Sequence, residues 1–230
     1  VAVRGWAEAI EAILSTAAPR FPLDVARLRS EAAILDRFKV DLYWDQPDSA
    51  VALVLELTSM IPGLRTMRSD WGVWWKAPRW IVPTWQAVAD VVGGRGATRE
   101  GPKRTRRPAG GIVNEVAVTY ARPPSGDPYG LVTYTAEAVA DDPRVVADAR
   151  AARSQARWGV LTKSEEIPTW DRATAELHAS GVLAMSSWPR VGVPVSLPAT
   201  ARTERLAPGD VLAFSDPSLG LADVAAEVDA

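Results

Sequence analysis

The sequence contains no cysteine and only one histidine, His178. The absence of cysteine excludes disulfide bonds, thiolate metal sites and a cysteine nucleophile. No apolar run approaches the ~20 residues that a membrane-spanning helix needs, so none is predicted. With 26 Lys plus Arg and 28 Asp plus Glu, the formal charge is −2. Such a balance excludes a whole-chain field that would draw the protein to nucleic acid or to an anionic membrane.

Groups of residues typical of catalysis are also scarce. His178 has no sequence neighbour among the carboxylates except Glu176, which favours a surface or groove position over a triad or a metal ligand. Glu165 and Glu166 lie in an extended segment, where adjacent side chains point to opposite faces and cannot act as an acid and base pair. The acidic pair at 141–142 suits a helix N-terminus. The sequence therefore predicts no enzyme activity and no cofactor.

The first part of the chain has the apolar periodicity of three helices. These are predicted over residues 5–15, over 23–37 with Asp24 near the start, and over 50–60. Between the last two, residues 38–44 alternate in the manner of a strand.

Residues 64–76 are predicted to form a β-hairpin that turns at Ser69-Asp70. Five tryptophans lie in and after its second strand, and they form a candidate interface: Trp71, Trp74, Trp75, Trp80 and Trp85. One interpretation is an exposed aromatic platform for a glycan or a receptor. The other is a β layer whose large rings fill a core or a contact between subunits.

A basic stretch follows the tryptophans. Between residues 95 and 107 a single acid, Glu100, stands against six basic residues: Arg95, Arg99, Lys103, Arg104, Arg106 and Arg107. With glycine and proline around them, these residues indicate an exposed connector or a contact with an acidic partner. Contact with DNA phosphates, weakening with added salt, is the alternative. The stretch lacks the interleaved aromatics that stack on single strands.

The second part opens with an alternating strand over 112–120, which calls for an antiparallel partner at 131–135. A helix is predicted to start at Asp142-Pro143 and to end near Ala156, because an acid followed by proline is a typical helix start. Further elements are predicted after it: an extended piece at 158–162, a helix from Thr169 to Trp188, strands at 191–197, 199–204 and 211–215, and a type II corner at Pro208-Gly209.

These elements predict an α+β protein of two compact units, each a mixed and largely antiparallel sheet with packed helices. The predicted boundaries are 1–92 for the first unit, 93–110 for a basic Gly/Pro/Arg connector and 111–230 for the second unit.

The order of pieces in the second part resembles that of the central hub proteins of bacteriophage tails, including the tail-tip and host-specificity types. The resemblance rests on the strand Ile112–Tyr120, Asp142-Pro143, Ala156-Arg157-Trp158-Gly159, the helix from Thr169, and Leu206-Ala207-Pro208-Gly209-Asp210-Val211. It covers about 110 residues, and Trp158 stands where the family often has tyrosine.

This resemblance implies a virion structural protein at the tail tip, without a cofactor. Its expected form is a homotrimeric hub ring that joins the tail tube to the baseplate or tail fibres and surrounds the DNA exit channel. The implied partners are the distal tail protein, the tape measure and the tail fibres, with transient contact to genomic DNA. The alternative is a carbohydrate- or receptor-binding module that uses the Trp-rich segment 71–85. A glycan hydrolase ranks last, because no separated carboxylate pair is present.

Overall fold

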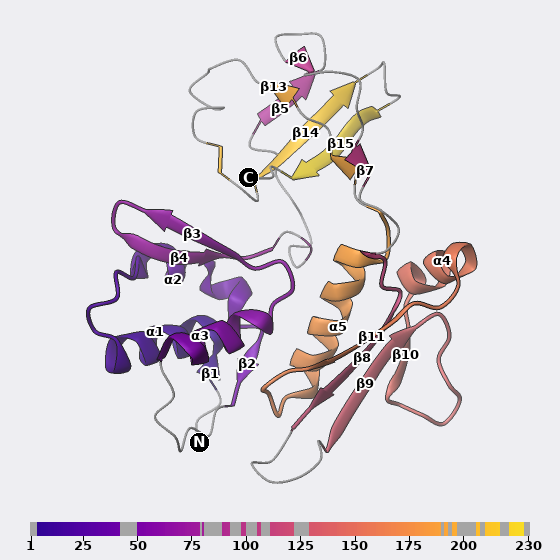
Figure 1. Cartoon of the computed structure of the whole chain (residues 1–230), viewed down its shortest axis with the longest axis horizontal. Coiled ribbons are helices and arrows are strands. Elements are labelled where there is room, and N and C mark those ends of the chain that lie inside the picture. The colour runs from indigo at the N-terminus through magenta and orange to yellow at the C-terminus, as the bar shows by residue number, and fades with distance from the viewer. Residues whose placement is uncertain are drawn as a thin grey trace. The chain divides into compact units, whose positions relative to one another are not determined.

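The computed structural model describes residues 4–41, 50–78, 80, 89–92, 98–99, 105–106, 111–121, 129–189, 191–192, 195–196, 206–207, 210–216 and 221–227. Its helices and its mixed and antiparallel sheets confirm the α+β class. Two compact units are present, Val1–Ile81 with Gly110–Trp188 and Val82–Ala109 with Pro189–Ala230 (Figure 1).

This division differs from the predicted boundaries of 1–92, 93–110 and 111–230. Within the stretch predicted to be a connector, β6 (Thr98–Arg99) pairs with β13 (Val195–Ser196), and β7 (Thr105–Arg106) pairs with β12 (Val191–Gly192). Its backbone therefore forms ladder hydrogen bonds with residues almost a hundred positions later. Glycine, proline and arginine density reports on local preference only, and pairing between distant segments overrides it.

The helices of the first unit's opening segment are α1 (Trp6–Ala17), α2 (Val25–Leu35) and α3 (Ala50–Ser59), as the periodicity predicted. Asp24 caps α2 by accepting a hydrogen bond from the Arg27 N–H at 3.2 Å. Helix α1 begins after Gly5, and its cap comes from the end of α2, where Asp36 accepts the Ala7 N–H at 2.7 Å. A Cβ on Gly5 would lie 2.3 Å from the Asp36 carboxyl carbon, so glycine gives the room for this cap.

Two short antiparallel pairs accompany these helices. Strand β1 (Arg4–Gly5) pairs with β2 (Lys39–Val40), and the rest of the predicted strand, residues 42–44, lies outside the described part of the chain. The predicted hairpin is confirmed as β3 (Arg65–Ser69) and β4 (Gly72–Lys76).

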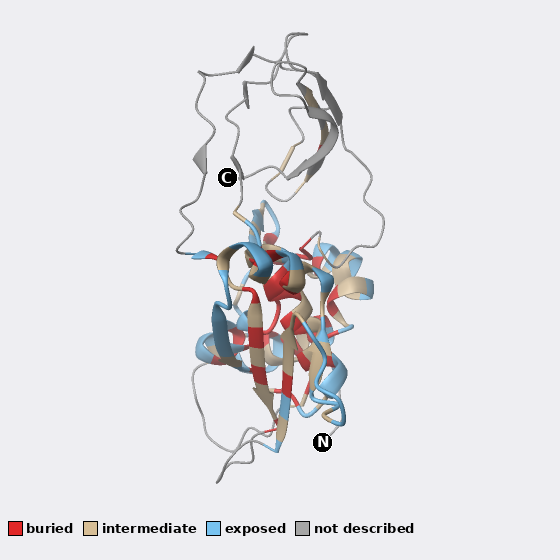
Figure 2. Ribbon diagram, turned by 90° about the vertical axis from the view of Figure 1, so that its right-hand side faces the viewer, coloured by how far each residue is buried: buried red, intermediate tan, exposed pale blue. Residues whose placement is uncertain are grey.

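The second segment of this unit is a four-stranded sheet in the order β10-β9-β8-β11. Strands β8 (Glu115–Tyr120) and β9 (Gly130–Thr135) are antiparallel, as predicted. Strand β10 (Val145–Ala147) runs parallel to β9, and β11 (Thr162–Glu166) runs parallel to β8. Buried and less buried positions alternate along β8 (Figure 2), since helix α5 (Arg172–Ser186) packs on one face of the sheet.

The predicted helix start at Asp142-Pro143 is wrong. Asp142 binds Arg144 in a turn, and the β-branched pair Val145 and Val146 continues as β10. Helix α4 (Ala149–Trp158) begins only after Asp148, whose carboxylate accepts the Arg150 N–H at 2.8 Å. Both aspartates satisfy the capping rule locally, and strand pairing with β9 selects the second.

The second unit contains a three-stranded sheet in the order β15-β14-β5. Strand β14 (Val211–Asp216) pairs antiparallel with β15 (Leu221–Glu227) and parallel with β5 (Ala89–Val92). The prediction missed β15. The Asp210 N–H donates to the Ala207 carbonyl at 3.0 Å, a bond that spans the predicted corner. Residues Pro208-Gly209 and the predicted strand 199–204 lie outside the described residues.

One hydrophobic core runs through the first unit and joins its opening segment to the sheet. Trp6 is fully buried, meets Trp75 edge to face at 5.7 Å between ring centroids, and donates its indole N–H to the Leu57 carbonyl at 2.7 Å. Residues of β8 and α5, including Val116 and Leu183, belong to the same core. The two segments of the chain therefore fold as parts of one unit.

Candidate functional site

The Trp-rich set is divided between the core and the surface. Trp74 and Trp75 are only 7% and 3% exposed, although they are neighbours on a strand. Trp80 is half-buried, with its indole N–H donating to the Pro62 carbonyl at 2.6 Å. Trp71, at the turn of the hairpin, is 79% exposed. Trp85 lies outside the described residues.

This division separates the two interpretations of the tryptophans. Trp74 and Trp75 fill the core, as the second interpretation expected, and they present no open ring face to a ligand. Trp71 alone of the four described rings offers a large apolar surface. A candidate contact site on this hairpin is therefore one aromatic side chain at the tip of a turn.

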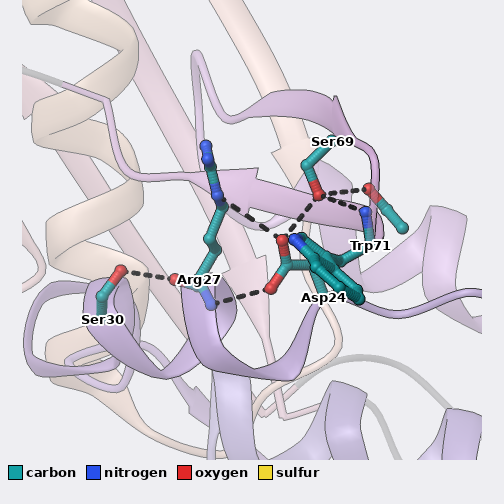
Figure 3. Close-up of polar contacts among 6 residues, drawn as sticks. Asp24, Arg27, Ser30, Ser69 and Trp71 are labelled. Carbon is teal, nitrogen blue, oxygen red and sulfur yellow. Dashed lines mark hydrogen bonds and ion pairs between the residues drawn. The ribbon is translucent and has the colours of Figure 1, made fainter.

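Side chains of α2 and β3 fix the backbone that carries Trp71 (Figure 3). The Ser69 hydroxyl donates to the Asp24 carboxylate at 2.6 Å and accepts the Trp71 N–H at 3.2 Å. Because Asp24 also caps α2, the carboxylate ties the helix start to the hairpin tip. We call this set, Asp24, Ser69 and the Arg27 N–H, the tip lock. The sequence marked Asp24 as a cap but gave no sign of its second bond.

The chain before α2 holds the other side of the turn. The Val73 N–H donates to the Pro22 carbonyl at 2.6 Å, and the Asp24 N–H donates to the Val73 carbonyl at 2.9 Å. Gly72 has φ +140°, and a Cβ there would lie 2.2 Å from the Pro22 carbonyl oxygen. Only glycine allows this approach without backbone movement, so the exposed indole is mounted on a rigid turn.

The electrostatics of the tip lock favour an ionised Asp24. The hydrogen bond from Ser69, and then the backbone hydrogen bond and the charge of Arg27, lower the pKa of Asp24 below its usual value against the opposing effect of burial. Arg27 also places its guanidinium 5.5 Å from the Trp74 ring centroid. The side chain thus covers a core tryptophan while its charge stays near the carboxylate.

The structure describes little of the basic stretch. Arg99 and Arg106 belong to β6 and β7, where their backbones pair with Val195 and Val191. Their side chains lie outside the description, as do the other four basic residues: Arg95, Lys103, Arg104 and Arg107. Whether these cations form one surface stays a prediction.

The expectation of a surface or groove position for His178 is wrong. The ring is 2% exposed; its Nδ1 lies 2.8 Å from the Met60 carbonyl oxygen and its Nε2 lies 2.8 Å from Glu165 Oε2. The buried stripe of α5 includes Ala175, His178 and Val182, a helical spacing. That stripe could have been found in the sequence. The partners could not, because packing between distant segments sets them.

Glu165 faces α5, whereas Glu166 is exposed, as expected for neighbours on a strand. Lys163 Nζ lies 2.5 Å from the other carboxylate oxygen of Glu165. The hydrogen bond from His178, followed by Lys163, lowers the pKa of Glu165 to about 2 despite partial burial. We call His178, Glu165 and the Met60 carbonyl the α5 joint.

The described residues include no group of three or more His, Asp or Glu that could hold a metal ion. Among the helices of this part of the chain, none is long and apolar enough to cross a membrane. No protein-family model matches the chain, and no curated protein matches it.

Proposed function

We propose that this chain is a structural subunit of a bacteriophage tail tip, or of a phage-like particle, and that Trp71 contributes a contact between subunits of a homotrimeric hub ring. The ring would join the tail tube to the baseplate or tail fibres and surround the DNA exit channel. The observation that carries the proposal is the exposure of Trp71, 79%, on a turn held by the tip lock.

Leaving an indole ring exposed to water has a free-energy cost. Burying an aromatic side chain stabilises a protein or an interface by a few kcal/mol, and tryptophan is enriched among residues that dominate binding energy. A ring on a rigid turn loses little conformational entropy when it is buried by a partner. Trp71 has both properties, as expected of a residue that anchors an interface.

The tail-tip identity is supported by the sequence resemblance, whose pieces fall in the order strand, helix, strand, helix, corner. In the fold, the strand Ile112–Tyr120 contains β8, Ala156–Gly159 ends α4 before β11, and the helix from Thr169 contains α5, whereas Asp142-Pro143 lies in the turn before β10. The role is positional and involves no catalysis. The distal tail protein, tape measure and tail fibres are the proposed partners, with genomic DNA passing the basic stretch during ejection.

The test is the mass of the protein in solution by light scattering, combined with negative-stain images of the particle that contains it. A three-fold ring at a tail tip is the expected result. A protein that stays monomeric over the whole accessible concentration range and binds no tail protein would contradict the proposal.

The second candidate is a carbohydrate- or receptor-binding module, favoured by the same exposed indole. A sugar ring can stack on a tryptophan face, and a fixed turn would present that face. Titration with glycans while Trp fluorescence is followed separates the candidates, since a binding module responds and a subunit contact does not. No change up to millimolar sugar would remove this candidate.

A further inference from the structure

The α5 joint surrounds a histidine ring with acceptors on both sides. A backbone carbonyl can only accept a hydrogen bond, and so can an ionised carboxylate. Nδ1 faces the Met60 carbonyl oxygen and Nε2 faces Glu165 Oε2, each at 2.8 Å. A neutral imidazole has one N–H and one lone pair, so it would turn a lone pair toward one of these oxygens. Both hydrogen bonds form only when His178 and Glu165 together hold one proton more than a neutral imidazole and an ionised carboxylate do.

Lys163 indicates where that proton lies. Its ammonium group binds the second oxygen of Glu165 and favours the ionised carboxylate. With Glu165 anionic, both hydrogen bonds require a ring that carries two N–H groups and donates to both acceptors. Of the charged groups described around the joint, Glu165 contacts the ring and Lys163 acts through Glu165.

The elements that meet here are otherwise joined by close apolar packing. Gly181, one turn beyond His178 on α5, lies so near Trp80 that an added Cβ would be 2.2 Å from the indole. Gly63, in the turn after α3, stands in the same relation to Met185, with a Cβ 2.4 Å from its sulfur. The turn that contains Met60 and Gly63 therefore packs against α5. The α5 joint adds a polar contact between this turn and α5.

We propose that the α5 joint makes a contact inside the first unit depend on pH. The protonated His178 ring binds the turn after α3 and β11 at the same time, and loss of one ring proton weakens this link. When the ring releases its proton to solvent, one nitrogen presents a lone pair to an oxygen. That contact changes from a charge-assisted hydrogen bond to a repulsion inside the protein. The turn after α3 then separates from α5 more often, while the core around Trp6 stays formed. This inference does not depend on the tail-tip proposal.

The single histidine makes the test direct, because ring labelling with ¹⁵N gives one pair of resonances for the whole chain. On the full-length protein, both ring nitrogens are expected to carry hydrogens at the acid end of the folded range. As the pH rises and one hydrogen is lost, amide exchange of α5 and of residues 61–64 should accelerate beyond its intrinsic pH dependence. The expected factor is roughly five- to tenfold, the worth of one hydrogen bond.

Glu165→Gln provides the matched variant. A glutamine amide can either donate or accept, so it satisfies a neutral ring as well as a charged one. The excess pH dependence of exchange should disappear in this variant and persist in Glu166→Gln, which alters the exposed neighbour. A ring with a single N–H throughout the folded range would overturn the proposal, as would equal pH dependence in the parent and in Glu165→Gln.

Discussion

Two carboxylates in the first unit each tie a helix to a strand, and they differ in what donates to them. Asp24 accepts from a serine hydroxyl and a backbone N–H, which keep their hydrogens across the ordinary pH range. Glu165 accepts from a histidine and a lysine, and an imidazole, unlike a hydroxyl or a backbone N–H, has a neutral form with only one N–H. The tip lock should hold at any pH that leaves Asp24 ionised, whereas the α5 joint should respond to pH.

The difference between the donors to Asp24 and to Glu165 matches where each carboxylate lies in the fold. The tip lock holds the turn that displays Trp71, and an interface anchor is most effective when its geometry does not vary. The α5 joint lies between packed elements of one unit, where a change of contact alters how often the elements separate. The hydrogen-bond donor, more than the carboxylate, therefore decides whether a contact stays constant with pH, as in the tip lock, or varies with it, as in the α5 joint.

The largest expected effect comes from breaking the backbone beneath the tip lock. Gly72→Ala places a Cβ against the Pro22 carbonyl oxygen at a φ of +140°, and should destabilise the protein by about 2–3 kcal/mol in denaturant unfolding. Gly159→Ala, with φ +73° and nothing near its Cβ, measures the strain alone. If both variants lose the same stability, the close approach to Pro22 is not what fixes the turn.

Breaking the α5 joint should cost less. The lowering of the Glu165 pKa from 4.5 to about 2 corresponds in full to about 3 kcal/mol. Since 23% of the side chain is exposed, screening reduces the expected loss in Glu165→Gln to about 1–2 kcal/mol at neutral pH. Chemical denaturation measures it, and Glu166→Gln should be unchanged within about 0.5 kcal/mol. Equal losses of stability in the two variants would mean that the α5 joint contributes no more than the exposed neighbouring carboxylate does.

Acidic pH should remove the contribution of the Glu165 carboxylate to the free energy of unfolding. The folded pKa of Glu165 is depressed, so on the acid side its stabilisation is complete at about pH 4.5 and is lost as the pH falls through about 2. Asp142, whose pKa Arg144 also lowers to about 2, pairs with an arginine side chain that is 60% exposed, and it serves as the comparison. The slope of stability against pH between these values should flatten in Glu165→Gln and hardly change in Asp142→Asn.

A milder change to the tip lock should have a smaller effect. Asp24→Asn keeps an oxygen for the Arg27 N–H but replaces the oxygen that accepts from Ser69 with an NH2 group, so the Ser69 hydroxyl can only accept there. We expect a modest fall in melting temperature that does not vary with pH between 6 and 8, in contrast to the α5 joint. A strong pH dependence of this fall in that range would remove the distinction between the two joins.

The smallest effect on stability is expected at the tip itself. Trp71→Ala removes a side chain that is 79% exposed, so the free energy of unfolding should stay within about 0.5 kcal/mol of the parent. Thermal unfolding of the two proteins at low concentration is the measurement. A large loss would mean that the indole stabilises its own chain and is not reserved for a partner.

The sequence predicted what depends on near neighbours. Helix α2 with its Asp24 cap, the hairpin around Ser69 and the pairing of β8 with β9 follow from spacing, capping and alternation. The opposite directions of Glu165 and Glu166 follow from the two-residue period of a strand.

What failed depends on tertiary contacts that local spacing and capping do not specify. Pairing of β10 with β9 moved the helix start from Asp142 to Asp148. The burial of His178 needed Met60, 118 positions earlier, and Glu165, 13 positions earlier. Of the tryptophans, the sequence could mark the set but could not separate Trp71 from its buried neighbours, since the covering of Trp74 and Trp75 is a tertiary property.

Contact between chains is the role that we propose for Trp71. The most direct measurement is light scattering of the parent, of Trp71→Ala and of Trp170→Ala across the same concentration series, because Trp170 is a second exposed tryptophan, 50% exposed, whose ring lies beside Tyr129. Trimers are expected for the parent and for Trp170→Ala, and monomers for a still-folded Trp71→Ala. Trimers that persist without the Trp71 indole, or a parent that never associates, would contradict it.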